Sequence, residues 1–357
     1  MLKGPDDKIR VLVAEDSPVT RAMIVSMFES DPSFEVVAQA SDGREAVDLA
    51  RTQRPDIVTL DLEMPALTGI EAIEQIMSSC PVPILVVSGF ANAQNAYAAI
   101  SRGAVDVIDK PGTSDAEIQV FLDKARMVSS VPVITHVNVL RLGARIVDAP
   151  LMPAAPGSST NGPVFAVASS TGGPQALARI LGHLPPTFGS PILIAQHIAP
   201  GFAAGMAKWL ATVSRLPVKL AEGGEALSAG VVYMSPSEAH MTVSASGKIA
   251  FKVLKDTDIY RPSCDALLES IAATYGPRSV GIILTGMGHD GAKGMEAIKA
   301  AGGTTIAQDE ASSVVFGMNQ AAITSGSICK VIGLPEIALE MLRLVEDATA
   351  HLKNPAR

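Results

Sequence analysis

A serine that follows a short apolar run is the first candidate for chemistry in this sequence. Residues 164–168 read Val-Phe-Ala-Val-Ala, and Ser169, Ser170 and Thr171 come next, before Gly-Gly-Pro and a helical pattern. A turn from a strand into a helix exposes free backbone N–H groups and the positive end of the helix dipole. Ser170 could therefore be a nucleophile beside an oxyanion site, although a glycine-rich turn whose hydroxyls only cap the helix explains the same residues.

Two further apolar runs lead to residues that could activate this serine. The run 191–195 leads through one glutamine to His197, and the run 280–284 leads into a glycine-rich turn that contains Asp290. Because the carboxyl ends of parallel strands converge on one crevice, the serine, the histidine and the aspartate could meet. An imidazole takes the proton of a serine, and a carboxylate fixes the tautomer of the imidazole. The sequence thus predicts acyl transfer, although a histidine or an aspartate in such a position is, taken alone, more often a structural histidine or a turn residue that caps the next helix.

A second group of polar residues follows apolar runs in the first third of the chain. The five runs alternate with helical patterns and occupy residues 11–13, 34–38, 57–60, 84–87 and 105–108. The polar residues that follow the runs are Glu15, Asp16, Asp61, Ser88 and Lys110. Clustered carboxylates repel one another unless a cation lies between them, and oxygen ligands suit Mg²⁺. Asp61 could then attack a phosphoryl group whose oxygens Mg²⁺ and Lys110 screen, with Ser88 donating a hydrogen bond. Helix capping along a solvated rim is the alternative.

Composition limits the classes of protein to which the chain can belong. It has 357 residues, 48% of them hydrophobic, and a net charge of -8, with no basic stripe that would bind nucleic acid. No signal-like segment or membrane-spanning apolar run is present, so we expect a cytoplasmic protein without membrane insertion. The number of cysteines is odd and they are widely spaced, at Cys80, Cys264 and Cys329. This pattern favours ordinary buried thiols over disulfides or a zinc site.

The elements that must position these residues form an α/β protein of two domains. Alternating strands and helices predict a doubly wound, five-stranded parallel sheet first, and then a doubly wound, mainly parallel hydrolytic domain with a β-hairpin. The hairpin is expected at residues 241–243 and 248–251, and the last helix from about Pro335 to Leu352. We predict domains at 1–128 and 163–357, joined by a proline-rich linker at 129–162 whose middle part, 136–146, could form a docking helix. The chain order serine, histidine, aspartate differs from that of α/β-hydrolases.

The N-terminal motifs resemble those of response-regulator receiver domains. They are Val11-Leu12-Val13-Ala14-Glu15-Asp16-Ser17, Thr59-Leu60-Asp61-Leu62-Glu63-Met64-Pro65 and Gly103-Ala104-Val105-Asp106-Val107-Ile108-Asp109-Lys110-Pro111. The resemblance implies that Asp61 is phosphorylated by a histidine kinase. It also implies that Mg²⁺ is bound by Asp16, Asp61 and the backbone carbonyl of Glu63, and by Glu15 through water.

The C-terminal motifs resemble the chemotaxis protein-glutamate methylesterase family. They are Ser169-Ser170-Thr171-Gly172-Gly173-Pro174, Gln196-His197, Arg261-Pro262-Ser263, the segment 284–291 and the segment 307–318. The resemblance implies a cytoplasmic, phosphorylation-activated hydrolase that demethylates glutamate methyl esters, and deamidates glutamines, on methylated chemoreceptors, with the chemotaxis histidine kinase as phosphodonor. Ser170 is then the nucleophile, His197 the general base, Asp290 the orienting carboxylate and the Met287 amide an oxyanion donor. No cofactor is expected in the esterase site.

Three positions depart from the family pattern. Glu15 stands where receivers of this type commonly carry Asp, so its carboxylate reaches one methylene further. Tyr260 stands where the family often has His, and it can donate a hydrogen bond but cannot titrate near neutrality. His289 occupies a position that is often small or polar, and we expect it to face solvent. We also expect the unphosphorylated receiver to inhibit the hydrolase.

Two alternatives to a chemotaxis esterase stay open. One is an acyl hydrolase, controlled by the receiver, that acts on a protein outside chemotaxis. The other is a non-catalytic adaptor whose pocket only binds a receptor peptide.

Overall fold

The computed structural model describes residues 8–89, 93–131, 162–255 and 257–353, and the chain divides into two compact units, 1–145 and 146–357. Each unit is described by itself. The domain boundaries given above remain predictions, because most of the proposed linker, including the predicted docking helix, lies outside the described residues.

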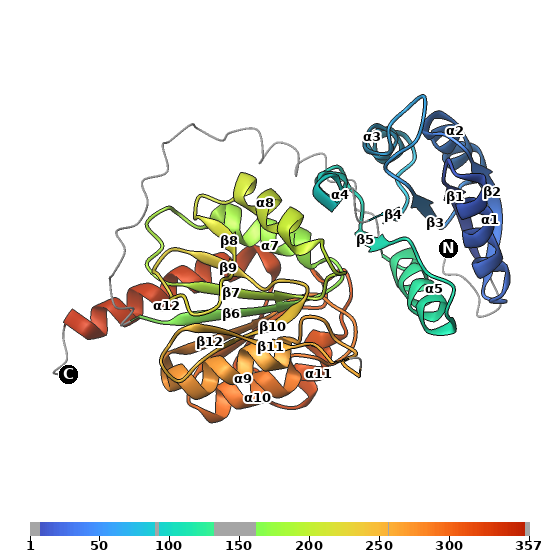
Figure 1. The fold of residues 1–357 in the computed structure, drawn as a ribbon. Coiled ribbons are helices and arrows are strands. Elements are labelled where there is room, and N and C mark those ends of the chain that lie inside the picture. The colour runs from blue at the N-terminus through green and yellow to red at the C-terminus, as the bar shows by residue number, and fades with distance from the viewer. Residues whose placement is uncertain (1–7, 90–92, 132–161, 256, 354–357) are drawn as a thin grey trace. The chain divides into compact units, whose positions relative to one another are not determined.

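The N-terminal unit is a five-stranded parallel sheet with the order β2-β1-β3-β4-β5, flanked by helices, as Figure 1 shows. Its strands are β1 (Ile9–Ala14), β2 (Phe34–Ala40), β3 (Ile57–Leu60), β4 (Ile84–Ser88) and β5 (Asp106–Asp109). Its helices are α1 (Pro18–Glu29), α2 (Gly43–Gln53), α3 (Gly69–Ser79), α4 (Ala93–Ser101) and α5 (Asp115–Ser129). The predicted five-stranded, doubly wound architecture is confirmed.

Local side-chain chemistry starts several of these helices. Ser114 and Glu117 form a full capping box at α5, in which each side chain bonds the backbone N–H of the other residue. Asp42 caps α2 with its side chain, but the Glu45 carboxylate accepts from the backbone amide of Ser41 instead of closing a box. These caps fix where each helix leaves the carboxyl edge of the sheet or returns to it.

The C-terminal unit is built on a seven-stranded sheet with the order β14-β13-β12-β6-β7-β9-β8, and every adjacent pair is parallel. Its strands are β6 (Val164–Ser169), β7 (Ile192–Gln196), β8 (Val218–Leu220), β9 (Val232–Met234), β12 (Ser279–Ile283), β13 (Thr304–Gln308) and β14 (Lys330–Ile332). The helices are α7 (Gly173–His183), α8 (Ala203–Val213), α9 (Cys264–Tyr275), α10 (Ala292–Ala300), α11 (Met318–Thr324) and α12 (Leu334–Lys353), with a 3₁₀ turn η2 (Gly276–Arg278).

The predicted hairpin and last helix are both present. An antiparallel pair of strands, β10 (Ala239–Val243) and β11 (Ile249–Val253), forms a separate two-stranded sheet. The last helix, α12, begins one residue earlier and ends one residue later than predicted.

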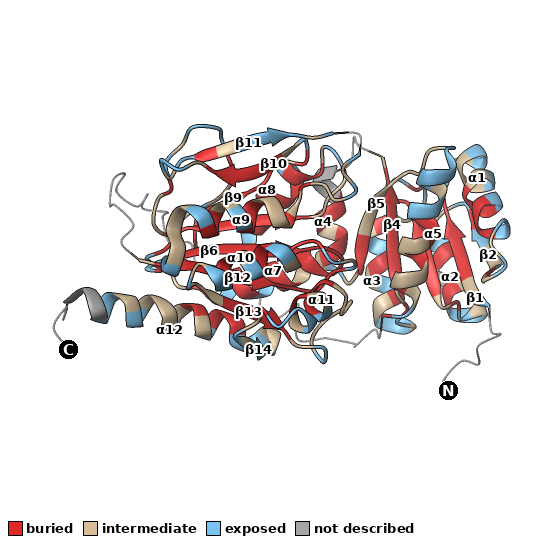
Figure 2. Ribbon diagram, turned by 90° about the horizontal axis from the view of Figure 1, so that it is seen from below, coloured by how far each residue is buried: buried red, intermediate tan, exposed pale blue. Residues whose placement is uncertain are grey.

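Burial separates the inner strands from the outer helix faces (Figure 2). All residues of β6, β7 and β12 are buried. Such continuous burial is typical of parallel strands covered on both faces. Of the three cysteines predicted to be buried, only Cys264 is: Cys80 is half-buried and Cys329 is exposed. That prediction was wrong for two residues because both lie at element ends, Cys80 as the C-cap of α3 and Cys329 just before β14.

Candidate functional site

The predicted catalytic serine and histidine lie on adjacent strands of the C-terminal sheet. β6 is central, and the chain builds outward to β7 on one side before it returns to β12 on the other. Such a reversal of strand order is where α/β sheets bind ligands. Ser169 pairs with Gln196 in the β6–β7 register, and the His197 amide donates to the Ser169 carbonyl at 2.9 Å. Ser170 and His197 are therefore side by side at the carboxyl edge, where neighbouring strands are about 4.8 Å apart.

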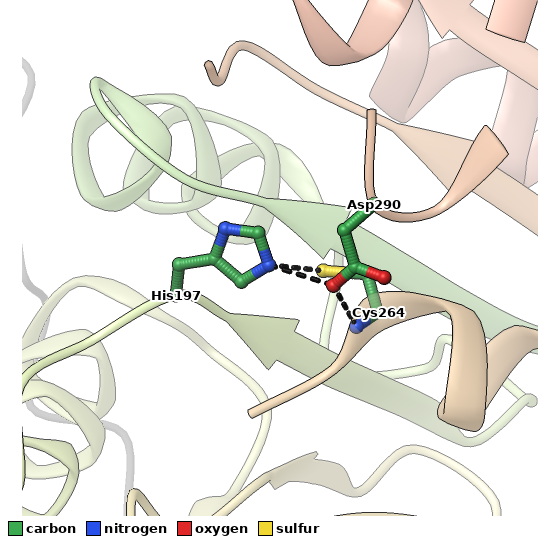
Figure 3. A group of neighbouring side chains, drawn as sticks. All are labelled: His197, Cys264 and Asp290. Atoms are coloured by element: carbon green, nitrogen blue, oxygen red, sulfur yellow. Dashed lines mark hydrogen bonds and ion pairs between the residues drawn. The ribbon is translucent and has the colours of Figure 1, made fainter. Parts of the chain in front are cut away.

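The imidazole of His197 bonds the carboxylate of Asp290. Nε2 lies 2.8 Å from Oδ2, as Figure 3 shows. Among the described residues, no hydrogen bond involves Nδ1, and none joins the Ser170 hydroxyl to the imidazole. Because Nε2 is occupied, Nδ1 is the nitrogen available to accept the serine proton. In ligand-free sites the hydrogen bond between nucleophile and base is often long or absent, and it forms only when substrate binds.

Asp290 is held at the N-terminus of α9. Its carboxylate accepts hydrogen bonds from the backbone amides of Cys264 at 2.6 Å and Asp265 at 3.0 Å, and from the Ser263 hydroxyl at 3.2 Å. Helix N-termini stabilise anions through free N–H groups and the helix dipole. Burial acts to raise the pKa of Asp290, but the bond from His197 and the backbone amides outweigh it and lower the pKa. The carboxylate therefore stays ionised, as an orienting group requires.

The loop after β12 approaches the serine closely and offers a backbone donor. The Ser170 amide donates to the Thr285 carbonyl at 3.0 Å. A Cβ atom at Gly286 would lie 2.7 Å from the Cβ of Ser170, so only glycine permits this approach. No backbone hydrogen bond of the described residues uses the amide of Met287, the predicted oxyanion donor. The amide is thus available to a ligand, and its role remains a prediction.

The sequence did not predict the contacts that two buried residues, Gln196 and Cys264, make within the site. Gln196 accepts from the Ser169 hydroxyl at 2.7 Å and donates to the Ser170 carbonyl at 2.8 Å, which fixes the turn that carries the serine. Cys264 places its sulfur 3.5 Å from His197 Nε2 (Figure 3). For Cys264 the sequence did offer a signal, because Ser263 is typical of a helix N-cap. A helix that begins there presents the amide of Cys264 to an anion.

Tyr260 and His289, which both depart from the family pattern, contact each other, and Tyr260 also contacts the imidazole of His197. The Tyr260 ring stacks on that of His197, with centroids 5.1 Å apart and 17° between the planes. The Tyr260 hydroxyl lies 3.3 Å from Nδ1 of His289. His289 is exposed, as expected, but it also holds the tyrosine that covers the imidazole.

We expect Tyr260→Ala to lower kcat about two- to tenfold, because an aromatic contact is worth about 0.5–1.5 kcal/mol and the imidazole loses one wall. Tyr260→Phe keeps the ring and is expected to retain nearly full activity. Steady-state hydrolysis of a methyl-esterified receptor peptide measures both variants. Equal losses in the two variants would show that the hydroxyl, not the stacked ring, is what matters.

Asp265 lies beside Asp290 and braces the turn that carries it. Its Oδ1 accepts from the amides of Gly291 and Gly294, each at 2.8 Å. Burial raises the pKa of Asp265 and the charge of Asp290 adds to this effect, so that the pKa reaches about 6 despite the backbone bonds. The folded state therefore favours the protonated form more than the unfolded chain does.

This raised pKa predicts a pH-dependent effect of Asp265→Asn. In the wild type, stability contributed by the protonated carboxyl is complete below about pH 4 and is lost as the pH rises through about 6. Asparagine keeps the oxygen acceptor and cannot ionise, so the stability of wild type relative to the variant should fall across this window. Urea unfolding followed by fluorescence of Trp209, the single tryptophan, reports on this unit. Parallel pH profiles for the two proteins would contradict the assignment.

The polar residues predicted at the edge of the N-terminal sheet do converge. One carboxylate oxygen each from Glu15, Asp16 and Asp61 lies within 4.8 Å of the others. Lys110 Nζ is 2.8 Å from an oxygen of Asp61 and 2.8 Å from one of Glu15. Burial raises the pKa of Glu15 in spite of this ammonium. Burial acts to lower the pKa of Lys110, but its bonds to Asp61 and Glu15 outweigh this and raise it, so the ammonium stays charged.

The donor set fits both Mg²⁺ and a phosphoryl group. Carboxylate oxygens are hard ligands that Mg²⁺ prefers, and no backbone amide of the described chain donates to the carbonyl of Glu63, which follows Asp61 in the same loop. The Ser88 hydroxyl is fully buried at the end of β4 and has no hydrogen-bond partner among the described residues. A buried hydroxyl without a partner is costly. A phosphoryl oxygen on Asp61 would satisfy it.

Comparison with known proteins extends over both units. A family model described as CheB methylesterase matches residues 165–341, and one described as response regulator receiver domain matches residues 11–121. In the described part of the chain, no helix has the length and apolar character needed to span a bilayer.

Relatives with assigned names match nearly the whole chain. A protein-glutamate methylesterase/protein-glutamine glutaminase of Paramagnetospirillum magneticum is 52% identical over 94% of this chain and 96% of its own. One of Anaeromyxobacter dehalogenans is 42% identical over 94% of this chain and 97% of its own. The crystal structure of the Thermotoga maritima CheB methylesterase catalytic domain is 40% identical, with a TM-score of 0.49, and covers 52% of this chain and 99% of that chain. The chain therefore belongs to the family of protein-glutamate methylesterases/protein-glutamine glutaminases, in which a CheB methylesterase domain follows a response regulator receiver domain.

Proposed function

We propose that this protein hydrolyses glutamate methyl esters, and deamidates glutamines, on chemoreceptors, and that phosphorylation of Asp61 activates it. The single observation that carries the proposal is the imidazole–carboxylate pair of His197 and Asp290 at the strand edge beside Ser170. The names of relatives at up to 52% identity support the choice of ester and amide substrates. A chemotaxis histidine kinase is the proposed phosphodonor and methylated receptors are the proposed substrates, in the cytoplasm.

The reaction follows from the roles of these side chains. The Ser170 hydroxyl attacks the ester carbonyl while Nδ1 of His197 takes its proton, and the Met287 amide stabilises the oxyanion. Asp290 holds Nε2–H and stabilises the imidazolium. Methanol, or ammonia from a glutamine, leaves with the proton from Nδ1. Water then attacks the glutamyl-serine and loses a proton to His197. The bond between the acyl carbon and the Ser170 oxygen breaks as the imidazolium returns that proton to the serine, and the glutamate carboxyl is released and ionises.

The receiver site supplies the control in this proposal. Mg²⁺, when bound, neutralises charge on the incoming phosphoryl group. Asp16 and Asp61, with the Glu63 carbonyl, would hold the ion, and Glu15 would contact it through water. Asp61 is the nucleophile toward phosphorus, Lys110 pairs with its carboxylate, and Ser88 donates to the new phosphoryl oxygen.

Replacing Asp61 by asparagine should abolish activation without removing basal hydrolysis, because the amide cannot accept a phosphoryl group. We expect a small-molecule phosphodonor with Mg²⁺ to raise methanol release by wild type and to leave the variant unchanged. The matched control is Asp48→Asn, an exposed carboxylate on α2 that pairs with Arg51, and it should retain stimulation. Stimulation of Asp61→Asn equal to that of wild type would place the phosphoacceptor elsewhere.

A further inference from the structure

The Cys264 thiol, which donates a weak hydrogen bond to the Ala195 carbonyl at 3.4 Å, lies beside the proposed catalytic pair. Its sulfur lies 3.5 Å from Nε2 of His197, and Nε2 lies 2.8 Å from Oδ2 of Asp290 (Figure 3). One ligand atom from each of the three residues lies within 4.8 Å of the others. An imidazole nitrogen, a thiol sulfur and a carboxylate oxygen thus converge from three separate segments of the chain.

The hydrolytic mechanism gives this thiol no part. The contact of Cys264 that orients Asp290 comes from its backbone amide, at 2.6 Å, and any residue except proline would supply it. The side chain is completely buried, and burial together with the charge of Asp290 raises the pKa of the thiol well above its ordinary value. A backbone hydrogen bond at Ser169 acts in the opposite direction but is outweighed, so the thiol stays protonated without a ligand. A cation bound to the sulfur would stabilise the thiolate.

The spacing fits a tetrahedral soft-metal site. Zinc binds sulfur at about 2.3 Å and imidazole nitrogen at about 2.0–2.1 Å, so a tetrahedral angle sets the two ligand atoms about 3.5 Å apart. The observed separation of sulfur and Nε2 is 3.5 Å. Nε2 and the carboxylate oxygen would have to move apart by about 0.5 Å, and two metal bonds would then replace their hydrogen bond. Thiolate and imidazole ligands favour Zn²⁺ and exclude Mg²⁺.

We propose that His197, Cys264 and Asp290 form an inhibitory zinc site, with water in the fourth position. The thiol proton leaves to solvent when the metal binds. A neutral imidazole that is coordinated through Nε2 carries its proton on Nδ1. Nδ1 then cannot accept the serine proton, and Asp290 no longer orients the ring. Zinc therefore acts here as a reversible inhibitor and not as a cofactor; the inhibition rests on the proposed esterase function, whereas the binding does not.

Cobalt and zinc titrations of the full chain test this site, with excess Mg²⁺ present to fill the carboxylate site of the receiver. We expect wild type to show a thiolate-to-cobalt charge-transfer absorption that zinc displaces and a chelator removes. Cys264→Ala and the closely isosteric Cys264→Ser should lack the absorption while keeping the circular dichroism of the fold. The matched control is Cys329→Ser, which changes an exposed thiol and should keep it. Zinc should inhibit methanol release by wild type at concentrations at least about tenfold lower than for Cys264→Ser.

Three results would overturn the proposal: no charge-transfer absorption in wild type, an unchanged absorption in both Cys264 variants, or its loss in Cys329→Ser. Equal inhibition of wild type and Cys264→Ser by zinc would also overturn it. The optical titration needs no catalysis. A wild type that binds cobalt through Cys264 but releases no methanol would therefore refute the esterase function and support the metal site.

Discussion

Ser170→Ala should lower kcat/KM for a methyl-esterified receptor peptide by at least about 10⁴-fold, because alanine removes the hydroxyl that forms the proposed acyl intermediate. The residue is 8% exposed directly after β6, beside His197 and close to Gly286 in the loop that carries Met287. Alanine fits the same space and keeps the backbone bonds to Thr285 and Gln196. Substrate binding should therefore survive, so the loss is expected in kcat. Methanol release under saturating peptide measures it.

The preceding serine provides a matched control. Ser169 is fully buried and its hydroxyl donates to Gln196 at 2.7 Å, so it supports the turn without reaching the substrate. Its replacement by alanine removes one hydrogen bond, worth about 1 kcal/mol, and should cost about fivefold in activity. If the Ser169 variant lost activity and the Ser170 variant did not, the nucleophile would have been assigned to the wrong hydroxyl.

Asp290→Asn should lower kcat by about 10³–10⁴-fold, because an amide can donate to Nε2 and so favour the tautomer that carries its proton on Nδ1. That tautomer cannot take the serine proton. The lowered pKa of Asp290 also means that its contribution to stability is present above the ordinary aspartate pKa and is lost as the pH falls through the folded value. Steady-state kinetics at neutral pH, with urea unfolding as a check on the fold, measures the effect.

A second histidine–aspartate pair in the same unit serves as the control. Nε2 of His240 lies 2.9 Å from Oδ2 of Asp258, almost the same distance as in the proposed catalytic pair. Nδ1 of His240 accepts from the Ser263 amide, so this imidazole has no free nitrogen for proton transfer. Asp258→Asn should leave kcat within a few-fold of wild type. Equal losses in Asp258→Asn and Asp290→Asn would mean that both pairs act only through the fold.

Strand ends were the part of the site that sequence could predict. Ser170 and His197 each follow an apolar run, and the two runs form adjacent parallel strands. The residues that follow such strands lie side by side. The same reasoning brought Asp61 and Lys110 together, and they lie 2.8 Å apart. It required only strand order, which follows from alternating strands and helices with short connections.

Contacts made by helix starts and loops could not be predicted in this way. Asp290 is anchored by the amides of Cys264 and Asp265, about 25 residues earlier in the chain, and the direction of α9 decides that contact. The stacking of Tyr260 on His197 likewise depends on where a loop folds back. Loop paths and helix directions are set by packing over the whole unit, and neither spacing nor residue type encodes them locally.

Methanol release from methylated chemoreceptor membranes, with and without a phosphodonor and Mg²⁺, tests the account most directly. We predict that wild type releases methanol, that the phosphodonor raises the rate, and that Ser170→Ala releases none under either condition. Absence of methanol from wild type with Asp61 demonstrably phosphorylated would contradict the proposed esterase, and would favour a binding adaptor or an acyl hydrolase with another protein substrate.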